Sequence, residues 1–399
     1  MFSFFRRSFR QWARGSETGT AKPTARRLHC EALEDRTLPT VTIGSSLVNT
    51  TRPGADMQAA TATSGNGSSV VVWTEMKGTV DCDIMAQRYD ALGRKAGGEI
   101  TVATGRNPQH NPSVAMDGYG SFAVVWTEDF SSTDSDIHGA LFRADGTKIG
   151  NGFTVAETPQ REYDPSVGRA ANGDFVVSYT YQFGRNDLDI KAVQYRSNCT
   201  VARTINVANG TYVEEHSHVA VAADGRFAVA YQALGNVYVS RYTSTGTRVG
   251  WSAVGATSRT ESNASIGMDN RGDVLVAWQE QNGRDSNIMA RAINSAGVMG
   301  RAFLVWGTPA YECNPAVAVD PNTGKSVIAW QSQSGSVPSV QVMELNERQS
   351  YVRTWTMGTG MSSPALSAGG PWHRFVLAAQ SGRTSYDWDG GVFASLSTL

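Results

Sequence analysis

Two short polar patterns recur along the chain, and the first has the residue types of a calcium site. It is D-x-[DN], placed shortly before an apolar run, and its members are Asp81, Asp83, Asp134, Asp136, Asp187, Asp189, Asp285 and Asn287, with a glycine-rich variant at Asp387 and Asp389. Oxygens at i and i+2 suit Ca²⁺, which takes six to eight oxygen ligands. Ca²⁺ is the one cofactor that the pattern suggests, but no complete D-x-[DN]-x-[DN]-G loop occurs, and no cofactor is assigned. The alternative is that each side chain only caps the backbone where a strand starts.

The second pattern pairs a glutamate with a polar residue two positions later. Its members are Glu162, Asp164, Glu214, His216, Glu261, Asn263, Glu312 and Asn314, and Asp56 and Asn111 match only the last position. The pattern precedes the first apolar run of each repeat described below, which is expected to line a central channel. We expect these groups to form a partial polar ring at the channel mouth, the usual place for a ligand in a concave centre. Capping of the turn by the last residue is the alternative.

Catalytic and metal-binding chemistry have weaker signals. His216 and His218 form an HxH pair in one copy of the second pattern, and His110 in a neighbouring repeat would complete a metal site. Hydrolysis or elimination of a polysaccharide needs positioned acid and base groups, and two-carboxyl glycosidases space them by about 5 to 9.5 Å. The candidates for that chemistry are Glu162, Glu214 and Glu261. No G-x-S-x-G elbow for a nucleophilic serine occurs.

These patterns recur because the chain is built from repeats. The stretch "NPSVAMDGYGSFAVVWTED" nearly returns as "NASIGMDNRGDVLVAWQE". Apolar runs that end in an aromatic residue close at Trp73, Trp126, Tyr179, Tyr231, Trp278 and Trp330, and a seventh run, "FVLAA", ends at Ala379. Successive separations are 53, 53, 52, 47, 52 and 49 residues. A period near fifty residues indicates a repeat architecture.

Each repeat reads as four short strands separated by glycine and aspartate turns. We therefore predict an all-β fold, a seven-bladed β-propeller of four-stranded antiparallel blades. The seventh repeat lacks a fourth strand. We expect residues near 47–51 to complete it and close the ring, which removes two exposed sheet edges. The aromatic residue of each repeat is expected to pack between neighbouring blades.

The predicted strand order divides the loops between two faces. One face carries tight turns such as "DGYG" and "ADGT", in which glycine adopts positive φ and the Asx residue bonds to its own backbone. The connections on the opposite, top face hold twenty acidic and eight basic residues. The formal net charge of −1 therefore conceals a negative face that would attract cations or a basic partner. The near-neutral total argues against a nucleic-acid partner.

The first forty residues differ in composition from the rest. "MFSFFRRSFRQWARG" is basic and aromatic, and no apolar signal-peptide core follows its paired arginines. We predict a disordered basic leader over 1–40 and the propeller over 41–399. No run approaches the roughly 18 apolar residues of a membrane helix, so no membrane span is expected. The four cysteines lack CxxC spacing and are expected to be free thiols.

Two stretches resemble known bacterial proteins. "CEALEDRTLPT" resembles the LEPR-XLL type segment of exported proteins through Leu33, Glu34, Arg36 and Leu38, with Asp35 in place of proline. The blade pattern "NPSVAMDGYGSFAVVWTE" followed by "SDIHGALFRADG" resembles the repeats of bacterial secreted propellers, broadly of the TolB and WD40-like kind, over 41–399. The resemblance implies a propeller located outside the cell or at its surface.

Three functions stay open at this point. The main hypothesis is a noncatalytic exported binding or adhesion module, monomeric, whose acidic top face engages an unidentified protein or glycan. The alternatives are a glycoside hydrolase or polysaccharide lyase that uses top-face carboxylates, and a purely structural scaffold. The propeller fold hosts all three, so the fold does not choose among them.

Overall fold

The computed structural model describes residues 44–49, 56–77, 81–255, 257–371, 373–381 and 392–397. The chain divides into two units, Met1–Thr40 and Val41–Leu399, and all described residues lie in the second. The expected leader, its LEPR-XLL-like segment, and Asp387 and Asp389 lie outside the described residues. Over the described part of the chain, no helix has the length and apolar character that crossing a membrane requires.

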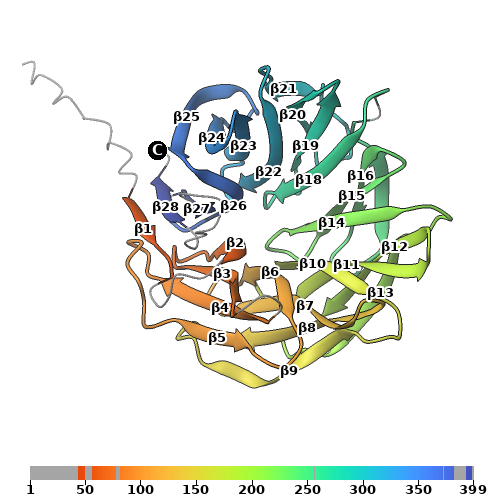
Figure 1. Cartoon of the computed structure of the whole chain (residues 1–399), viewed down its shortest axis with the longest axis vertical. Helices are drawn as coiled ribbons and strands as arrows, with labels where there is room; N and C mark the ends of the chain where they lie inside the picture. Colours follow the sequence, from red (N-terminus) through yellow and green to blue (C-terminus); the bar gives the residue numbers. More distant parts are fainter. Residues whose placement is uncertain are drawn as a thin grey trace, which may run out of the picture. The chain divides into compact units, whose positions relative to one another are not determined.

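All regular elements in these ranges are β-strands, and they pair antiparallel in groups of four (Figure 1). The first three groups are β2 (Met57–Thr63), β3 (Ser69–Met76), β4 (Cys82–Tyr89) and β5 (Ile100–Ala103); β6 (Gln109–Met116), β7 (Phe122–Ser131), β8 (Asp134–Phe142) and β9 (Lys148–Ala156); and β10 (Glu162–Arg169), β11 (Phe175–Gly184), β12 (Asp187–Tyr195) and β13 (Val201–Ala208). The next three are β14 (Glu214–Val221), β15 (Phe227–Ala233), β16 (Asn236–Tyr242) and β17 (Arg248–Ala253); β18 (Glu261–Met268), β19 (Val274–Asn282), β20 (Asp285–Ile293) and β21 (Phe303–Trp306); and β22 (Tyr311–Val319), β23 (Ser326–Ser334), β24 (Val337–Leu345) and β25 (Tyr351–Thr359).

The last group combines both ends of the second unit. It contains β26 (Met361–Gly369), β27 (Arg374–Ser381), β28 (Val392–Ser397) and β1 (Gly44–Leu47). β1 pairs with β28 in a register that sets Gly44 opposite Ser395 and Leu47 opposite Val392. Residues 50 and 51, which were expected to extend this strand, lie outside the described residues.

The first strand of each group lies innermost and contacts the first strands of its two neighbours. The contacts follow the order β2, β6, β10, β14, β18, β22 and β26, and β26 contacts β2. A single parallel bridge between Ser286 and Tyr311 also joins the β18–β21 group to the β22–β25 group, so these eight strands form one continuous sheet path. The predicted all-β propeller of four-stranded antiparallel sheets is confirmed.

The core lies between neighbouring sheets, because the second strands bury side chains on both faces. One cluster joins Val70 and Ile84 of the first group to Phe122 and Trp126 of the second. The aromatic residues that close the second strands are at most 6% exposed: Trp73, Trp126, Tyr179, Tyr231, Trp278 and Trp330. Their predicted role as packing residues between sheets is confirmed, and none of them offers a free face for ligand stacking.

Candidate functional site

Each innermost strand starts with a β-bulge that places one polar residue in a left-handed conformation. The register with the second strand shifts there in all seven first strands. The bulge residues have φ between 47° and 56°, and we call them the channel ring: Gln58, Asn111, Asp164, His216, Asn263, Asn314 and Ser363. Asn, Asp and His tolerate this region better than other non-glycine residues. The pattern E-x-[DNH] therefore marks a backbone requirement as well as a chemical one.

Hydrogen bonds connect four successive members of the channel ring. The Oε1 atom of Gln58 accepts from the backbone N–H of Asn111 at 2.9 Å. The Nδ2 atom of Asn111 donates to Oδ1 of Asp164 at 2.8 Å, and Oδ2 of Asp164 lies 3.0 Å from Nδ1 of His216. Across the ring, Nδ2 of Asn263 is 3.5 Å from Oδ1 of Asn314. The network is charged and continuous from β2 to β14 and sparse elsewhere.

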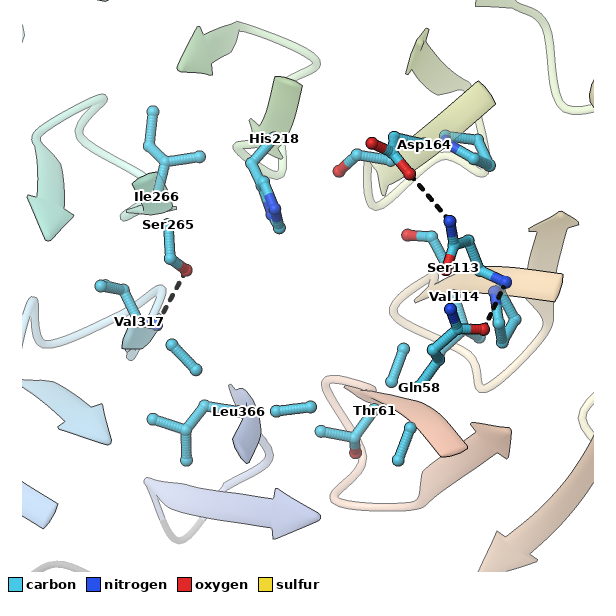
Figure 2. A pocket seen from close by; sticks show the side chains of 18 of the residues that line it. Gln58, Thr61, Ser113, Val114, Asp164, His218, Ser265, Ile266, Val317 and Leu366 are labelled. Carbon is cyan, nitrogen blue, oxygen red and sulfur yellow. Dashed lines mark hydrogen bonds between the residues drawn. The ribbon is translucent and has the colours of Figure 1, made fainter. Parts of the chain in front are cut away.

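A cavity of about 440 Å³ lies at the centre of the first strands (Figure 2). Its polar lining includes Gln58, Asn111, Asp164, His216 and His218. Its apolar lining includes Ile266, Ala316, Val317, Ala365 and Leu366. Figure 2 shows Gln58 and Asp164 across the cavity from Ile266 and Val317. The site therefore presents a hydrogen-bonding wall and an apolar wall to one ligand, as small-molecule sites commonly do.

His218 occupies a position that holds serine in three other first strands. Ser113, Ser166 and Ser265 each accept a hydrogen bond from a backbone N–H of the next first strand, at 3.0 to 3.1 Å. The imidazole of His218 instead extends into the cavity and is exposed there (Figure 2). Desolvation by the surrounding protein, and then the neighbouring His216, lower the pKa of His218. Since an unperturbed histidine has a pKa near 6.5, His218 is neutral at pH 7 and able to accept a proton.

His216 has the opposite tendency. Its hydrogen bond to Asp164 outweighs desolvation and raises the pKa of the imidazole, with smaller contributions from the charges of Asp164 and Glu215. The carboxylate of Glu215 lies 3.9 Å from Nε2 of His216. One cavity therefore contains two imidazoles whose environments push their protonation states apart, an arrangement that separates acid and base roles.

The glutamates of the same pattern do not face the channel. Glu162, Glu214, Glu261 and Glu312, here called the glutamate belt, are at most 5% exposed and lie between sheets. They accept hydrogen bonds from the turn that precedes their strand: Gly210 N–H donates to both oxygens of Glu214, and Thr257 N–H donates to Oε1 of Glu261. The expectation that these four carboxylates ring the mouth is corrected, because the bulge turns the chain between the glutamate and the channel-ring residue.

Two members of the glutamate belt differ in how well their carboxylates are hydrogen-bonded. Glu312 accepts from Thr308 Oγ1 at 2.7 Å, Ser332 Oγ at 3.0 Å and Trp330 Nε1 at 2.8 Å. Glu162 accepts from Thr158 Oγ1, and its buried Oε2 has no hydrogen-bond partner. Desolvation raises the pKa of Glu162 to about 7, and it also raises the pKa of Glu214.

The sequence alignment missed two members of the channel ring. Asp56 was expected at the last position of the pattern, but it is 3% exposed and lies two residues before the bulge, as the belt glutamates do. Gln58 holds the ring position instead, and Ser363 holds it in β26. Neither residue matches [DNH], so only the backbone conformation identifies them. His110, expected near the histidine pair, bonds to Asp129 at 2.9 Å and is not among the lining residues of the cavity.

The D-x-[DN] pairs lie at the start of the third strands. Asp83 is buried and contacts Lys77 Nζ, and Asp136 and Asp189 are buried with pKa values raised chiefly by desolvation. The intermediate residues Ser135 and Ser286 donate to backbone carbonyls of Glu162 and Glu312 in the next sheet. Among the described residues, no three His, Cys, Asp or Glu side chains are placed to hold a metal ion. Calcium ligation and capping of the strand both stay open for these pairs.

Burial and pairing reduce the negative face that the sequence count predicted. Among its acids, the glutamate belt and Asp136 are buried, and several others have basic partners. Arg259 contacts Glu280 at 2.6 Å, His110 contacts Asp129, and His216 contacts Asp164. The top face is therefore less repulsive toward an anionic ligand than its composition indicates.

Comparison with solved structures supports the fold. A polysaccharide lyase described as a PL25 ulvan lyase bound to a GlcA(1-4)Rha3S saccharide superposes with a TM-score of 0.59 at 11% identity, over 86% of this chain and 94% of that one. The polysaccharide lyase Uly1 gives 0.53 at 11% identity, over 84% and 90%. A protein of unknown function from Dyadobacter fermentans gives 0.52 at 8% identity, over 90% and 99%. No protein-family model and no curated protein sequence matches the chain. At these identities the likeness extends to the fold alone: the chain has the β-propeller fold that these polysaccharide lyases share.

Proposed function

We propose that this propeller cleaves a uronate-containing polysaccharide by β-elimination at the central cavity. One observation carries the proposal: His218, whose lowered pKa keeps it neutral, projects into the same cavity as His216, which Asp164 favours in its protonated form. A neutral imidazole is a suitable general base, and a cationic imidazole beside amide donors suits a substrate carboxylate. The shared fold with polysaccharide lyases is consistent with this assignment.

The proposed reaction uses two bonds of the uronate ring. His218 takes the proton from C5, and the electron pair of that C–H bond forms the C4–C5 double bond. The C4–O glycosidic bond breaks with its electron pair on the leaving oxygen. The imidazolium of His218 returns its proton to that oxygen, so the protein is regenerated and no other reactant is consumed. Interaction of the uronate carboxylate with His216 and with the Asn111 amide would stabilise the charge that develops during proton removal.

Hydrolysis by paired carboxylates has less structural support. Glu162, Glu214 and Glu261, the candidates from the sequence, are buried and accept hydrogen bonds from the backbone or side chains of the turns that precede their strands. Asp164 is the one carboxylate among the described residues that line the cavity, and it is paired with His216. A glycosidase of the two-carboxyl type needs a second accessible carboxyl group across the cleft.

Saccharide binding without turnover is the second candidate, and the lining of the cavity favours it. The described lining residues include no arginine, lysine or tyrosine, so a uronate carboxylate would be met only by His216 and neutral donors. Noncatalytic binding and elimination share the same site. They differ in whether an unsaturated product appears.

The test is incubation of the whole chain with uronate-containing polysaccharides, including one built of the GlcA(1-4)Rha3S repeat, and with a neutral dextran. The unsaturated uronate product is followed by ultraviolet absorbance and mass spectrometry. Product from a uronate polymer, and none from dextran, supports elimination. Binding measured by calorimetry with no product supports the noncatalytic candidate. Neither binding nor product contradicts both and favours a scaffold.

We further infer that the protein acts outside the cytoplasm. A polysaccharide substrate is too large to enter a cell unaided, and the LEPR-XLL-like segment at the N-terminus resembles those of exported proteins. Fractionation of the producing cells with an antibody against the propeller tests this inference. Recovery of the chain in the cytoplasm alone would contradict it.

A further inference from the structure

Among the top-face hairpins whose turns the structure describes, the hairpin of the fourth sheet, β14 to β17, is the shortest. β15 and β16 are seven residues each and are joined by Leu234 and Gly235 alone. The corresponding strands β11 and β19, in the sheets on either side, have 10 and 9 residues. At about 3.3 Å per residue, the hairpin of the fourth sheet is shorter than its neighbours by roughly 7 to 10 Å. Figure 1 shows this sheet between β10–β13 and β18–β21.

A groove of about 500 Å³ occupies the space above this short hairpin. Its lining comes from the β11–β12 turn, the loop before β14, the hairpin and the loop before β18, and it includes Tyr212, Val213, Glu215, Gln232, Leu234 and Ser262. The side chains of Tyr212, Val213 and Leu234 are 45%, 39% and 63% exposed. The groove therefore combines one exposed aromatic ring and two aliphatic groups with hydroxyl, amide and carboxylate groups.

Leu234 adds an unfavourable backbone conformation to this exposure. Its φ is 51° and that of Gly235 is 72°, the two positive values of a tight hairpin turn in which Asn-Gly is the usual pair. A branched apolar residue is costly in the left-handed region, and its side chain gains little from burial here. Local strain of this kind is concentrated at ligand-binding sites.

The groove adjoins the channel ring. Glu215 lines the groove, and its carboxylate lies 3.9 Å from Nε2 of His216. Gln232 also lines the groove; it donates to Glu215 at 2.8 Å and accepts from the backbone N–H of Asn263 at 3.2 Å. A ligand that fills the central cavity beside His216 can therefore extend outward over the fourth sheet.

We infer that this groove binds the saccharide units that extend from the cleavage site, so that the protein acts on long chains. The inference rests on the proposed function. The sugar rings have apolar C–H faces that pack on aromatic and aliphatic groups, and hydroxyls that bond to amides and carboxylates. Tyr212 supplies the ring surface, Leu234 an aliphatic contact, and Glu215, Gln232 and Ser262 the hydrogen-bonding groups.

The test measures binding against chain length in the full chain. Oligosaccharides of one, two and three GlcA(1-4)Rha3S repeats are titrated by calorimetry into the parent protein and into Tyr212→Ala, Tyr212→Phe and Leu234→Asn. The parent is expected to bind three repeats at least about tenfold more tightly than one. Tyr212→Ala is expected to remove most of that difference without changing the affinity for one repeat, whereas Tyr212→Phe retains it. Leu234→Asn, which suits the turn, is expected to stay folded and to weaken binding of three repeats severalfold.

The outcomes separate this inference from the proposed function. Equal affinity for all lengths in the parent, or equal loss at all lengths in Tyr212→Ala, overturns the groove assignment even if product forms. Length-dependent binding that Tyr212→Ala abolishes, without any product, supports the groove and contradicts elimination. Failure to bind any of the three oligosaccharides overturns both.

Discussion

The glutamate belt and the channel ring lie two residues apart in one sequence pattern, yet they meet different surroundings. Glu162 is buried between sheets, whereas Asp164 lines the cavity and contacts His216. In a regular strand, residues two apart share a face. The bulge and the left-handed residue interrupt that alternation, so the first position serves the fold and the second serves the site. Substitutions in the two layers should therefore separate stability from activity.

The largest expected effect is on activity, at His218. His218→Ala is expected to lower kcat/KM for the uronate polymer by about 10² to 10⁴, the usual contribution of a general base. The unfolding free energy should change by less than about 0.5 kcal/mol, because the ring is exposed in the cavity. Progress curves and thermal unfolding check the two expectations.

His110→Ala is the matched control, since His110 pairs with Asp129 outside the cavity lining. It should retain activity. A His218→Ala protein that is folded and fully active would remove His218 from the reaction.

The next largest effect is on stability, at Glu312. Glu312→Gln places an amide N–H among groups that donate to the carboxylate, namely Trp330, Thr308 and Ser332. We expect a loss of about 2 to 4 kcal/mol of unfolding free energy, because buried donors lose a charged acceptor. Chemical denaturation measures this loss. An unchanged denaturation midpoint would mean that the belt does not stabilise the fold.

Glu162→Gln, the corresponding substitution in the third sheet (β10–β13), should increase the unfolding free energy at high pH where Glu312→Gln decreases it. The pKa of Glu162 is raised from 4.5 to about 7, so the folded state holds a proton that the unfolded state has lost between these pH values. Its contribution therefore makes the protein less stable as the pH rises from about 4.5 to 7, by roughly 3 kcal/mol in total. Glu162→Gln should remove this dependence and stabilise the protein at pH 8 relative to the parent.

Denaturation of the parent and Glu162→Gln at pH 5 and pH 8 tests this expectation. A variant that is less stable than the parent at pH 8 would show that Glu162 is well solvated or paired. The contrast with Glu312 has a sequence cause. The residue opposite Glu312 on the second strand is Ser332, whereas the residue opposite Glu162 is Tyr181. Trp330 donates its indole N–H to Glu312, and the corresponding residue in the third sheet is Tyr179.

Substitution of Asp164 is expected to have a smaller effect on stability, together with a change in the pKa of His216. Asp164→Asn should lower the pKa of His216 toward its ordinary value, because the hydrogen bond and the charge of Asp164 raise it. In the parent, the pair stabilises the fold below the unfolded pKa of histidine, and this contribution is lost as the pH rises through the raised folded pKa. The pair is partly exposed, so the stability term should be below about 1 kcal/mol.

Titration of His216 by NMR in both proteins checks the shift of its pKa. The alkaline limb of the pH–rate profile should move to lower pH in Asp164→Asn. An unmoved limb would mean that the protonated state of His216 does not matter to the rate.

The smallest effect is expected from calcium. The D-x-[DN] residues belong to neither layer, and Asp83 already has Lys77 as its partner. We expect millimolar Ca²⁺, compared with chelator, to leave the thermal midpoint unchanged. A stabilisation of about 2.7 kcal/mol, as for a site at a hundred times its Kd, would assign the pairs as ligands.

The repeats alone determined the architecture. Alternating apolar residues, turn glycines and a period near fifty residues predicted four-stranded antiparallel sheets, and the buried aromatic residues of the second strands lie where that pattern placed them. These signals are local, and each repeat reinforces them, so a single sequence suffices. The same repeats also directed attention to Asp164 and His216, which do line the cavity.

Only the tertiary structure decided which polar residues face the channel. A shift of one residue in strand register moves a side chain from one face of the sheet to the other. The β-bulges introduce such a shift within the E-x-[DNH] pattern. Gln58 belongs to the channel ring because of its left-handed backbone conformation, and Glu162, two residues before Asp164, is buried instead. The pKa of His218 and that of His216 are shifted in opposite directions by segments that pack around them. The groove above the fourth sheet exists because the neighbouring hairpins are longer. Such relations between segments are properties of the packed sheets, which no single repeat contains.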